Sequence, residues 1–322
     1  ALDDCRHRLN QLFKGSAPER FIFTLNCTDA LNMAFKGLLN EGDHVITTDL
    51  EHNSVSRPLR IMELAGKISL TKINADSQGF IDPEQIKNAI GPKTRLVALT
   101  HASNVLGTIQ PITEVGTICR EKNIIFLVDG AQTAGVIPID IKAQKIDLLA
   151  CPGHKCLFGP TGTGFLYSGE RVALRTWREG GTGGDSSTET QPKEMPYHLE
   201  GGTPNVLGIA GLAAGNGPPF IASRHASFFG SSAAQHSFHL NHTLALYNTQ
   251  TQALCHLRWI FMDHKAMRRQ QSFEWQLLRA VHPSFDFFVP TAARLRLQFC
   301  QQVGLGEWPT LAALPQASHH LI

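Results

Sequence analysis

Short apolar runs alternate with helical patterns in the first two thirds of the chain, and this alternation constrains the fold most. Six runs have the length and composition of buried strands: 21–23, 44–47, 96–99, 124–128, 148–150 and 165–167. Between these runs, apolar residues recur at helical spacing in 31–39 and 115–119, and Asp82-Pro83 is typical of a helix start. Strands and helices in this order predict an α/β domain with a mostly parallel sheet.

The alternation stops near residue 215. Residues 216–322 are crowded with His, Gln and Phe, and no convincing strands separate their helical stretches. We therefore expect a domain over 1–215 and a divergent C-terminal segment over 216–322, whose fold the sequence does not assign.

Composition excludes several classes of protein. The 322 residues are 42% hydrophobic and 17% charged, which is ordinary for a globular chain. A net charge of +2 without a basic block gives no footprint for nucleic acid or for an anionic membrane surface. Neither a membrane-spanning apolar run nor a signal-peptide layout is visible, and the seven cysteines lack framework spacing, so we expect a cytoplasmic protein with reduced thiols.

The residues that follow the predicted strands carry the chemistry, because ligands of parallel sheets bind beyond the carboxyl ends of the strands. Five strand ends are followed by polar candidates: Thr28, His52, Asn104, Asp129 and Lys155. Thr28 has the position of a helix cap, and the free N–H groups of such a helix start also suit a phosphate. Asp129 is either the N-cap of a following helix or the partner of a buried cation. A lone histidine such as His52 is more often structural than functional.

Three other chemistries fit these residues poorly. A Walker loop needs glycines before its lysine and a hydroxyl after it, whereas Cys156 follows Lys155 and the glycines come later. The first strand is not followed by the GxGxxG of dinucleotide-binding folds. Zinc ligands drawn from His52, Cys151 and His154 lack the usual spacing. An amine, a carboxylate, a flat imidazole and a phosphate-ready helix start remain, and these are the parts of a pyridoxal phosphate site.

Seven short motifs, taken together, carry a resemblance to a known family. They are NCTDALN (26–32), LEHN (50–53), HASNVLG (101–107), VDGAQ (128–132), GHK (153–155), GTGG (181–184) and EGGTPN (200–205). In this order and spacing the chain resembles the class V aminotransferase fold family of pyridoxal-phosphate enzymes, most closely its cysteine desulfurase and selenocysteine lyase branch. The resemblance implies a PLP-dependent transferase fold of type I, here with an incomplete small C-terminal domain.

The resemblance also implies catalytic and ring-binding roles. Lys155 would form the Schiff base with pyridoxal 5'-phosphate and then shuttle protons. Asp129 would pair with the pyridinium nitrogen, and His52 would stack on the ring and assist acid–base steps. Gln132 would bond the phenolic oxygen, while Asn104 would face the cofactor and the substrate carboxylate.

A second group of residues would hold the phosphate. The resemblance assigns Thr28, the backbone at Cys27 and the ring of His154 to this task. It also implies that Thr182 completes the phosphate site of a second subunit, which predicts a homodimer. The expected partners are an amino-acid substrate and a sulfur-acceptor protein, with neither nucleic acid nor a membrane.

The chain departs from the family pattern at both ends. It opens inside a predicted helix that ends near 12–15, so we expect the family's usual N-terminal start to be missing. Pro152 stands where the family often has serine, the 223–227 remnant of the persulfide loop has no cysteine, and Asn241 stands where we expect the substrate-binding arginine. Cys255 is nearby but is more typical of a buried apolar residue than of a nucleophile.

Two functions remain open at this point. The first is a PLP-dependent cysteine desulfurase-like enzyme that acts on L-cysteine or a related amino acid through Lys155. The alternative is a degenerate relative that retains only the cofactor-binding domain and has little or no turnover.

Overall fold

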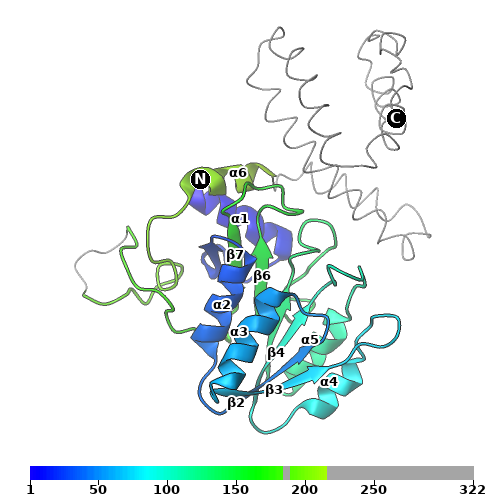
Figure 1. Ribbon diagram of the computed structural model, residues 1–322. Coiled ribbons are helices and arrows are strands. Elements are labelled where there is room, and N and C mark those ends of the chain that lie inside the picture. Colours follow the sequence, from blue (N-terminus) through cyan, green and yellow to red (C-terminus); the bar gives the residue numbers. More distant parts are fainter. Residues whose placement is uncertain (184–188, 216–322) are drawn as a thin grey trace, which may run out of the picture. The chain divides into compact units, whose positions relative to one another are not determined.

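A seven-stranded sheet organises the computed structural model, which describes residues 1–183 and 189–215 (Figure 1). Its strands are β1 (Phe21–Thr24), β2 (Asp43–Thr48), β3 (Ile68–Ile73), β4 (Thr94–Thr100), β5 (Ile125–Asp129), β6 (Leu148–Pro152) and β7 (Gly164–Ser168). The helices are α1 (Leu2–Phe13), α2 (Cys27–Leu38), α3 (Asn53–Leu64), α4 (Pro83–Ala89), α5 (Ile112–Glu121) and α6 (Val206–Gly215), with a short 3-10 helix at Pro18–Arg20.

The strands lie in the order β1-β7-β6-β5-β4-β2-β3. Neighbouring strands from β3 to β6 are parallel, whereas β7 is antiparallel to both β6 and β1. Six of the seven strands of this sheet therefore run in one direction, and their carboxyl ends meet at one edge. The predicted mostly parallel α/β fold is confirmed.

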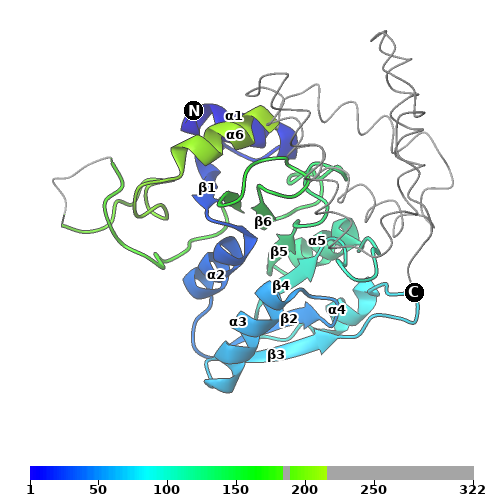
Figure 2. The ribbon, with the colours of Figure 1, turned by 45° about the horizontal axis from the view of Figure 1, so that its top comes forward.

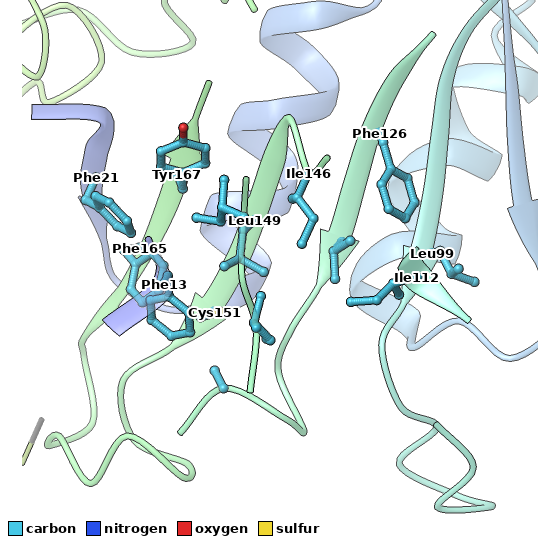
Figure 3. Close-up of a cluster of buried hydrophobic side chains, with 14 of the residues drawn as sticks. Phe13, Phe21, Leu99, Ile112, Phe126, Ile146, Leu149, Cys151, Phe165 and Tyr167 are labelled. Atoms are coloured by element: carbon cyan, nitrogen blue, oxygen red, sulfur yellow. The ribbon is translucent and has the colours of Figure 1, made fainter. Parts of the chain in front are cut away.

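Both faces of the sheet are buried, which explains why its strands are nearly continuous apolar runs. Along β5, Phe126 and Val128 join one hydrophobic cluster, and Ile125 and Leu127 join the other. Helices α2 and α3 cover the second cluster, while α1, α4, α5 and α6 contribute to the first. Figure 2 shows the two helical layers around the sheet, and Figure 3 shows the aromatic end of the first cluster, where Phe13 and Phe21 pack around Phe165.

The six predicted strands are all present, each within two residues of its expected bounds. Strand β3 was not predicted, because this edge strand buries only its first and last residues and lacks a clear alternation. The predicted helices correspond to α1, α2, α4 and α5. The domain boundary expected after residue 215 falls where the described residues end, and it stays a prediction.

The outer edge of β1 is closed by an ion pair between distant parts of the chain. The Arg6 guanidinium contacts Glu200 at 2.6 Å and donates to the carbonyl of Phe21. The other carboxylate oxygen of Glu200 accepts from the N–H of Phe23 at 2.7 Å. Two unpaired backbone groups of an edge strand are thereby satisfied. Burial raises the pKa of Glu200 despite the neighbouring arginine, as expected for a pair that costs desolvation energy.

Replacing Glu200 with Ala is expected to lower the free energy of unfolding by about 3 kcal/mol, because Arg6 stays buried without its main partner. Urea unfolding of the full chain, followed by circular dichroism, measures this change. Asp3→Ala is the matched control, since Asp3 contacts the same guanidinium with a side chain that is 90% exposed, and its loss should cost under about 1 kcal/mol. Equal effects of the two variants would contradict the role assigned to Glu200.

Candidate active site

The parallel strands bring four of the predicted site residues to one edge of the sheet. Asp129 ends β5, and its carboxylate lies 3.4 Å from the thiol of Cys27, at the start of α2. The charges of Lys155 and His52 both act on the same carboxylate. These side chains come from segments that follow β1, β2, β5 and β6. The structure thus brings together residues that the strand-end rule singled out, and their functional roles stay predictions.

Asp129 is a buried carboxylate, only 2% exposed. Burial raises its pKa, and this effect is opposed by the N–H of Ala131, which donates to Oδ1 at 2.9 Å, and by the charge of Lys155. The N-cap interpretation of Asp129 is wrong, because turns and not a helix occupy residues 131–136. A carboxylate in this position favours a cationic partner.

Lys155 is half-buried in the tight segment that leaves β6. A side chain on Gly153 would place its Cβ 2.1 Å from the Thr163 hydroxyl. The position two residues before the lysine therefore requires glycine. After the lysine, the N–H of Phe158 donates to its carbonyl, and Phe158 adopts a left-handed φ of 56°. The segment thus turns sharply on both sides of the amine.

His154 offers a polar atom that the described residues leave unused. Its Nδ1 is buried and finds no hydrogen-bond partner in the described part of the chain. Burial and the charge of Lys155 lower the pKa of the ring. A buried ring nitrogen of this kind is suited to a ligand that bonds it.

The N-terminus of α2 faces the same edge. Asn26, and not Thr28, is its N-cap, since the Asn26 side chain accepts from the N–H of Asp29 at 2.9 Å. The prediction that Thr28 caps this helix is therefore wrong. The backbone N–H groups of Cys27 and Thr28 belong to the first turn, where a helix supplies no acceptor, so they suit an anion.

His52 caps the next helix through its ring. The N–H of Ser54 donates to His52 Nδ1 at 3.1 Å, and the Ser54 hydroxyl lies 2.9 Å from the same nitrogen. The Ser54 hydroxyl also lies 2.7 Å from that of Thr28, so it connects α3 to the start of α2. Ser54 was missed from the sequence, although a histidine two residues before a serine at a helix start was a usable signal.

Glu51 is the second residue that sequence reasoning missed. Its Oε1 accepts from the N–H of Thr100 at 3.0 Å and from the hydroxyl of Thr48 at 2.9 Å, and these bonds tie the end of β2 to the end of β4. Its Oε2 is buried without a partner among the described residues. Burial raises the pKa of Glu51 to about 8, and the negative charges of Asp129 and Asp49 add to the effect. The carboxyl is therefore neutral at neutral pH.

Three further predicted residues lie in loop segments. Gln132 is half-buried in the turn after β5, and Asn104 is exposed on the loop after β4. Thr182 is half-buried beside the undescribed residues 184–188. The roles of all three stay predictions. The remnant at 223–227, Asn241 and Cys255 lie outside the described residues.

The thiols of the cluster are poor nucleophiles. Burial raises the pKa of Cys27 and of Cys151 well above the ordinary value, and the charge of Asp129 adds to both shifts. Burial also raises the pKa of Cys5 and Cys119 to about 12. Since the thiolate is the reactive form, burial works against a nucleophilic role for these four thiols.

Comparison with known proteins decides the family. The family described as Aminotransferase class-V matches residues 1–217. The chain belongs to this family. Class V aminotransferases are PLP-dependent, and their fold agrees with the sheet described above.

Among the described residues, none of the helices combines the length and the apolar character that a membrane span requires.

Relatives of this class V chain include cysteine desulfurases. A probable cysteine desulfurase of Methanothermobacter thermautotrophicus is 38% identical over 221 residues, which cover 66% of this chain and 54% of the relative. A cysteine desulfurase IscS of Clostridium botulinum is 38% identical over 219 residues, which cover 66% of this chain and 51% of the relative. The chain therefore spans about half the length of these relatives.

Solved structures of cysteine desulfurases also resemble this chain. The apo cysteine desulfurase of Thermococcus onnurineus NA1 has a TM-score of 0.64 at 32% identity, over 69% of this chain and 56% of that one. The cysteine desulfurase CsdA of Escherichia coli has a TM-score of 0.64 at 28% identity, over 73% and 58%.

Replacing Glu51 with Gln is expected to make stability less dependent on pH. The pKa rises from 4.5 in the unfolded chain to about 8 in the folded protein, so wild-type stability is full below pH 4.5 and falls as the pH rises through 8. The loss is at most about 5 kcal/mol. The free energy of unfolding, measured with urea at pH 5, 7 and 9, should rise in the variant relative to the wild type from each pH to the next. Glu114→Gln, at an exposed carboxyl of α5, should follow the wild type, and a constant difference between wild type and Glu51→Gln would refute the assignment.

Proposed function

We propose that the chain is a PLP-dependent, cysteine desulfurase-like enzyme that acts on L-cysteine or a related amino acid. The observation that carries the proposal is the buried carboxylate of Asp129, which lies within the electrostatic influence of Lys155 and His52 at the carboxyl edge of the sheet. The desulfurase relatives support the choice of substrate.

The described residues fit pyridoxal 5'-phosphate. The first-turn N–H groups at Cys27 and Thr28 offer donors to a phosphate. The Nδ1 of His154, which has no hydrogen-bond partner among the described residues, offers a further bonding group. Asp129 supplies the anion that a pyridinium nitrogen needs, and Lys155 supplies the amine. When bound, the cofactor supplies an electron sink that stabilises negative charge at the substrate Cα.

Each side chain then has a defined task. The Lys155 amine would hold the cofactor, and its free base would be the group that moves the proton at the substrate Cα. The negative charge of Asp129 would favour a protonated ring nitrogen, and His52 is proposed to contact the ring. Gln132 and Asn104 are proposed to contact the phenolic oxygen and the substrate carboxylate respectively.

The proposal also covers the oligomeric state of the enzyme, its protein partner and its location in the cell. A homodimer would let Thr182 of one subunit complete the phosphate site of the other. A sulfur-acceptor protein would take up the product sulfur. We place the enzyme in the cytoplasm, in agreement with cysteines whose spacing does not predict disulfides.

A second candidate is a relative that binds the cofactor and does not turn over. One observation favours it: the thiols of Cys5, Cys27, Cys119 and Cys151 all have raised pKa values, so none of these four offers a ready thiolate. A thiol nucleophile would then have to be a cysteine other than these four.

Replacing Lys155 with Ala is expected to abolish the visible absorption of the PLP-loaded full chain and to lower kcat by about 10²–10⁴-fold, the range of a lost acid–base catalyst. Absorbance and steady-state kinetics measure the two effects. Lys87→Ala, whose amine pairs with Glu84 on the surface of α4, is the control and should behave as wild type. Retained colour and turnover in Lys155→Ala would reject the assignment.

Cysteine turnover separates the two candidate functions. With PLP, L-cysteine and dithiothreitol as reductant, a desulfurase should release alanine and sulfide in equal amounts. A yellow protein that releases neither product supports the second candidate. Pyruvate in place of alanine would contradict desulfurase chemistry, because it signals elimination without transfer of sulfur to a thiol.

A further inference from the structure

The hydrogen bonds of Ser54 fix the tautomer of His52. The backbone N–H of Ser54 donates to His52 Nδ1 at 3.1 Å. A backbone N–H can only donate, so Nδ1 must accept and carries no hydrogen. The neutral ring therefore has its hydrogen on Nε2. This assignment follows from geometry alone.

The acceptor role of Nδ1 also determines which of the neighbouring hydroxyls donate and which accept. Because Nδ1 is an acceptor, the Ser54 hydroxyl at 2.9 Å must be the donor in that contact. Its single hydrogen is then used, so in the 2.7 Å contact with Thr28 the Ser54 oxygen accepts and the Thr28 hydroxyl donates. The hydrogen bonds are thus donated from Thr28 to Ser54 and from Ser54 to His52.

An anion at the start of α2 competes with this direction. Phosphate oxygens accept hydrogen bonds, and Thr28 has only one hydroxyl hydrogen. If that hydrogen turns to a phosphate, the Thr28 oxygen can keep its contact with Ser54 only as an acceptor. The Ser54 hydroxyl then turns away from His52 Nδ1.

We propose that Ser54 is a positioning residue that couples the phosphate end of α2 to His52 through a hydroxyl chain whose direction reverses when an anion binds at Thr28. The inference rests on the proposed function for the identity of the anion, a phosphate group. In the anion-free protein the hydroxyl and the backbone N–H of Ser54 share the single lone pair of Nδ1. With the anion bound, only the backbone N–H donates to it. Ser54 is almost fully buried, 9% exposed, so its hydroxyl has little access to water as an alternative partner.

Nitrogen NMR of the full chain, labelled with [15N]histidine, tests the proposal. The signals of His52 among the 15 histidines are identified by their loss in His52→Asn. In the anion-free wild type, Nδ1 should have the shift of an unprotonated nitrogen and Nε2 that of a protonated one. Inorganic phosphate, which lacks an aromatic ring, should move the Nδ1 signal to the position that it has in anion-free Ser54→Ala.

The variants isolate the hydroxyl of Ser54. Ser54→Ala and Thr28→Val should lose the phosphate-induced shift, and Thr28→Ser should keep it. Ser56→Ala is the matched control, since the Ser56 hydroxyl lies in the same first turn and donates to the carbonyls of Glu51 and His52, not to the ring. It should respond as wild type does.

Different failures point to different errors. A protonated Nδ1 in the anion-free wild type, or an undiminished phosphate shift in Ser54→Ala, overturns the inference. A protein that turns yellow with PLP but whose His52 signals do not move with inorganic phosphate overturns the inference and leaves the proposed function standing. Failure of both inorganic phosphate and pyridoxal phosphate to bind overturns the anion-driven reversal together with the proposed function.

Discussion

Asp129 holds a carboxylate at the tip of β5 almost without contact with water. Such a group is costly to ionise unless hydrogen bonds or a positive charge meet it. The Ala131 N–H and the Lys155 amine stabilise the ionised form, and burial still raises its pKa. The site is therefore organised around a negative charge that the described residues leave incompletely compensated, which is the condition that a pyridinium nitrogen satisfies.

The surrounding hydrogen bonds hold the strand ends in place around this charge. Glu51 ties β2 to β4 through Thr100, and Thr100 pairs with Asp129 in the register of β4 and β5. Ser54 ties α3 to α2 through Thr28. Each connection joins segments that are distant in sequence, so the site depends on the order of the sheet and not on any single loop.

Much of this arrangement could be predicted from the sequence, because buried parallel strands are apolar throughout and ligand-binding residues follow their ends. Asp129, Lys155 and His52 were singled out as candidates in this way. Strand β3 was missed because an edge strand need not be apolar. The α2 cap was assigned to Thr28 and not to Asn26 because both residue types cap helices, and only backbone geometry distinguishes them. Glu51 and Ser54 were missed because their importance lies in partners 49 and 26 residues away.

The most direct test is to locate the covalently bound cofactor. The full chain, loaded with pyridoxal phosphate, is reduced with borohydride and digested, and the phosphopyridoxyl group is mapped by mass spectrometry. The strand-end site predicts one labelled peptide that carries the group on Lys155. A label on a different lysine, or no label in a folded protein, would contradict the site built around Asp129.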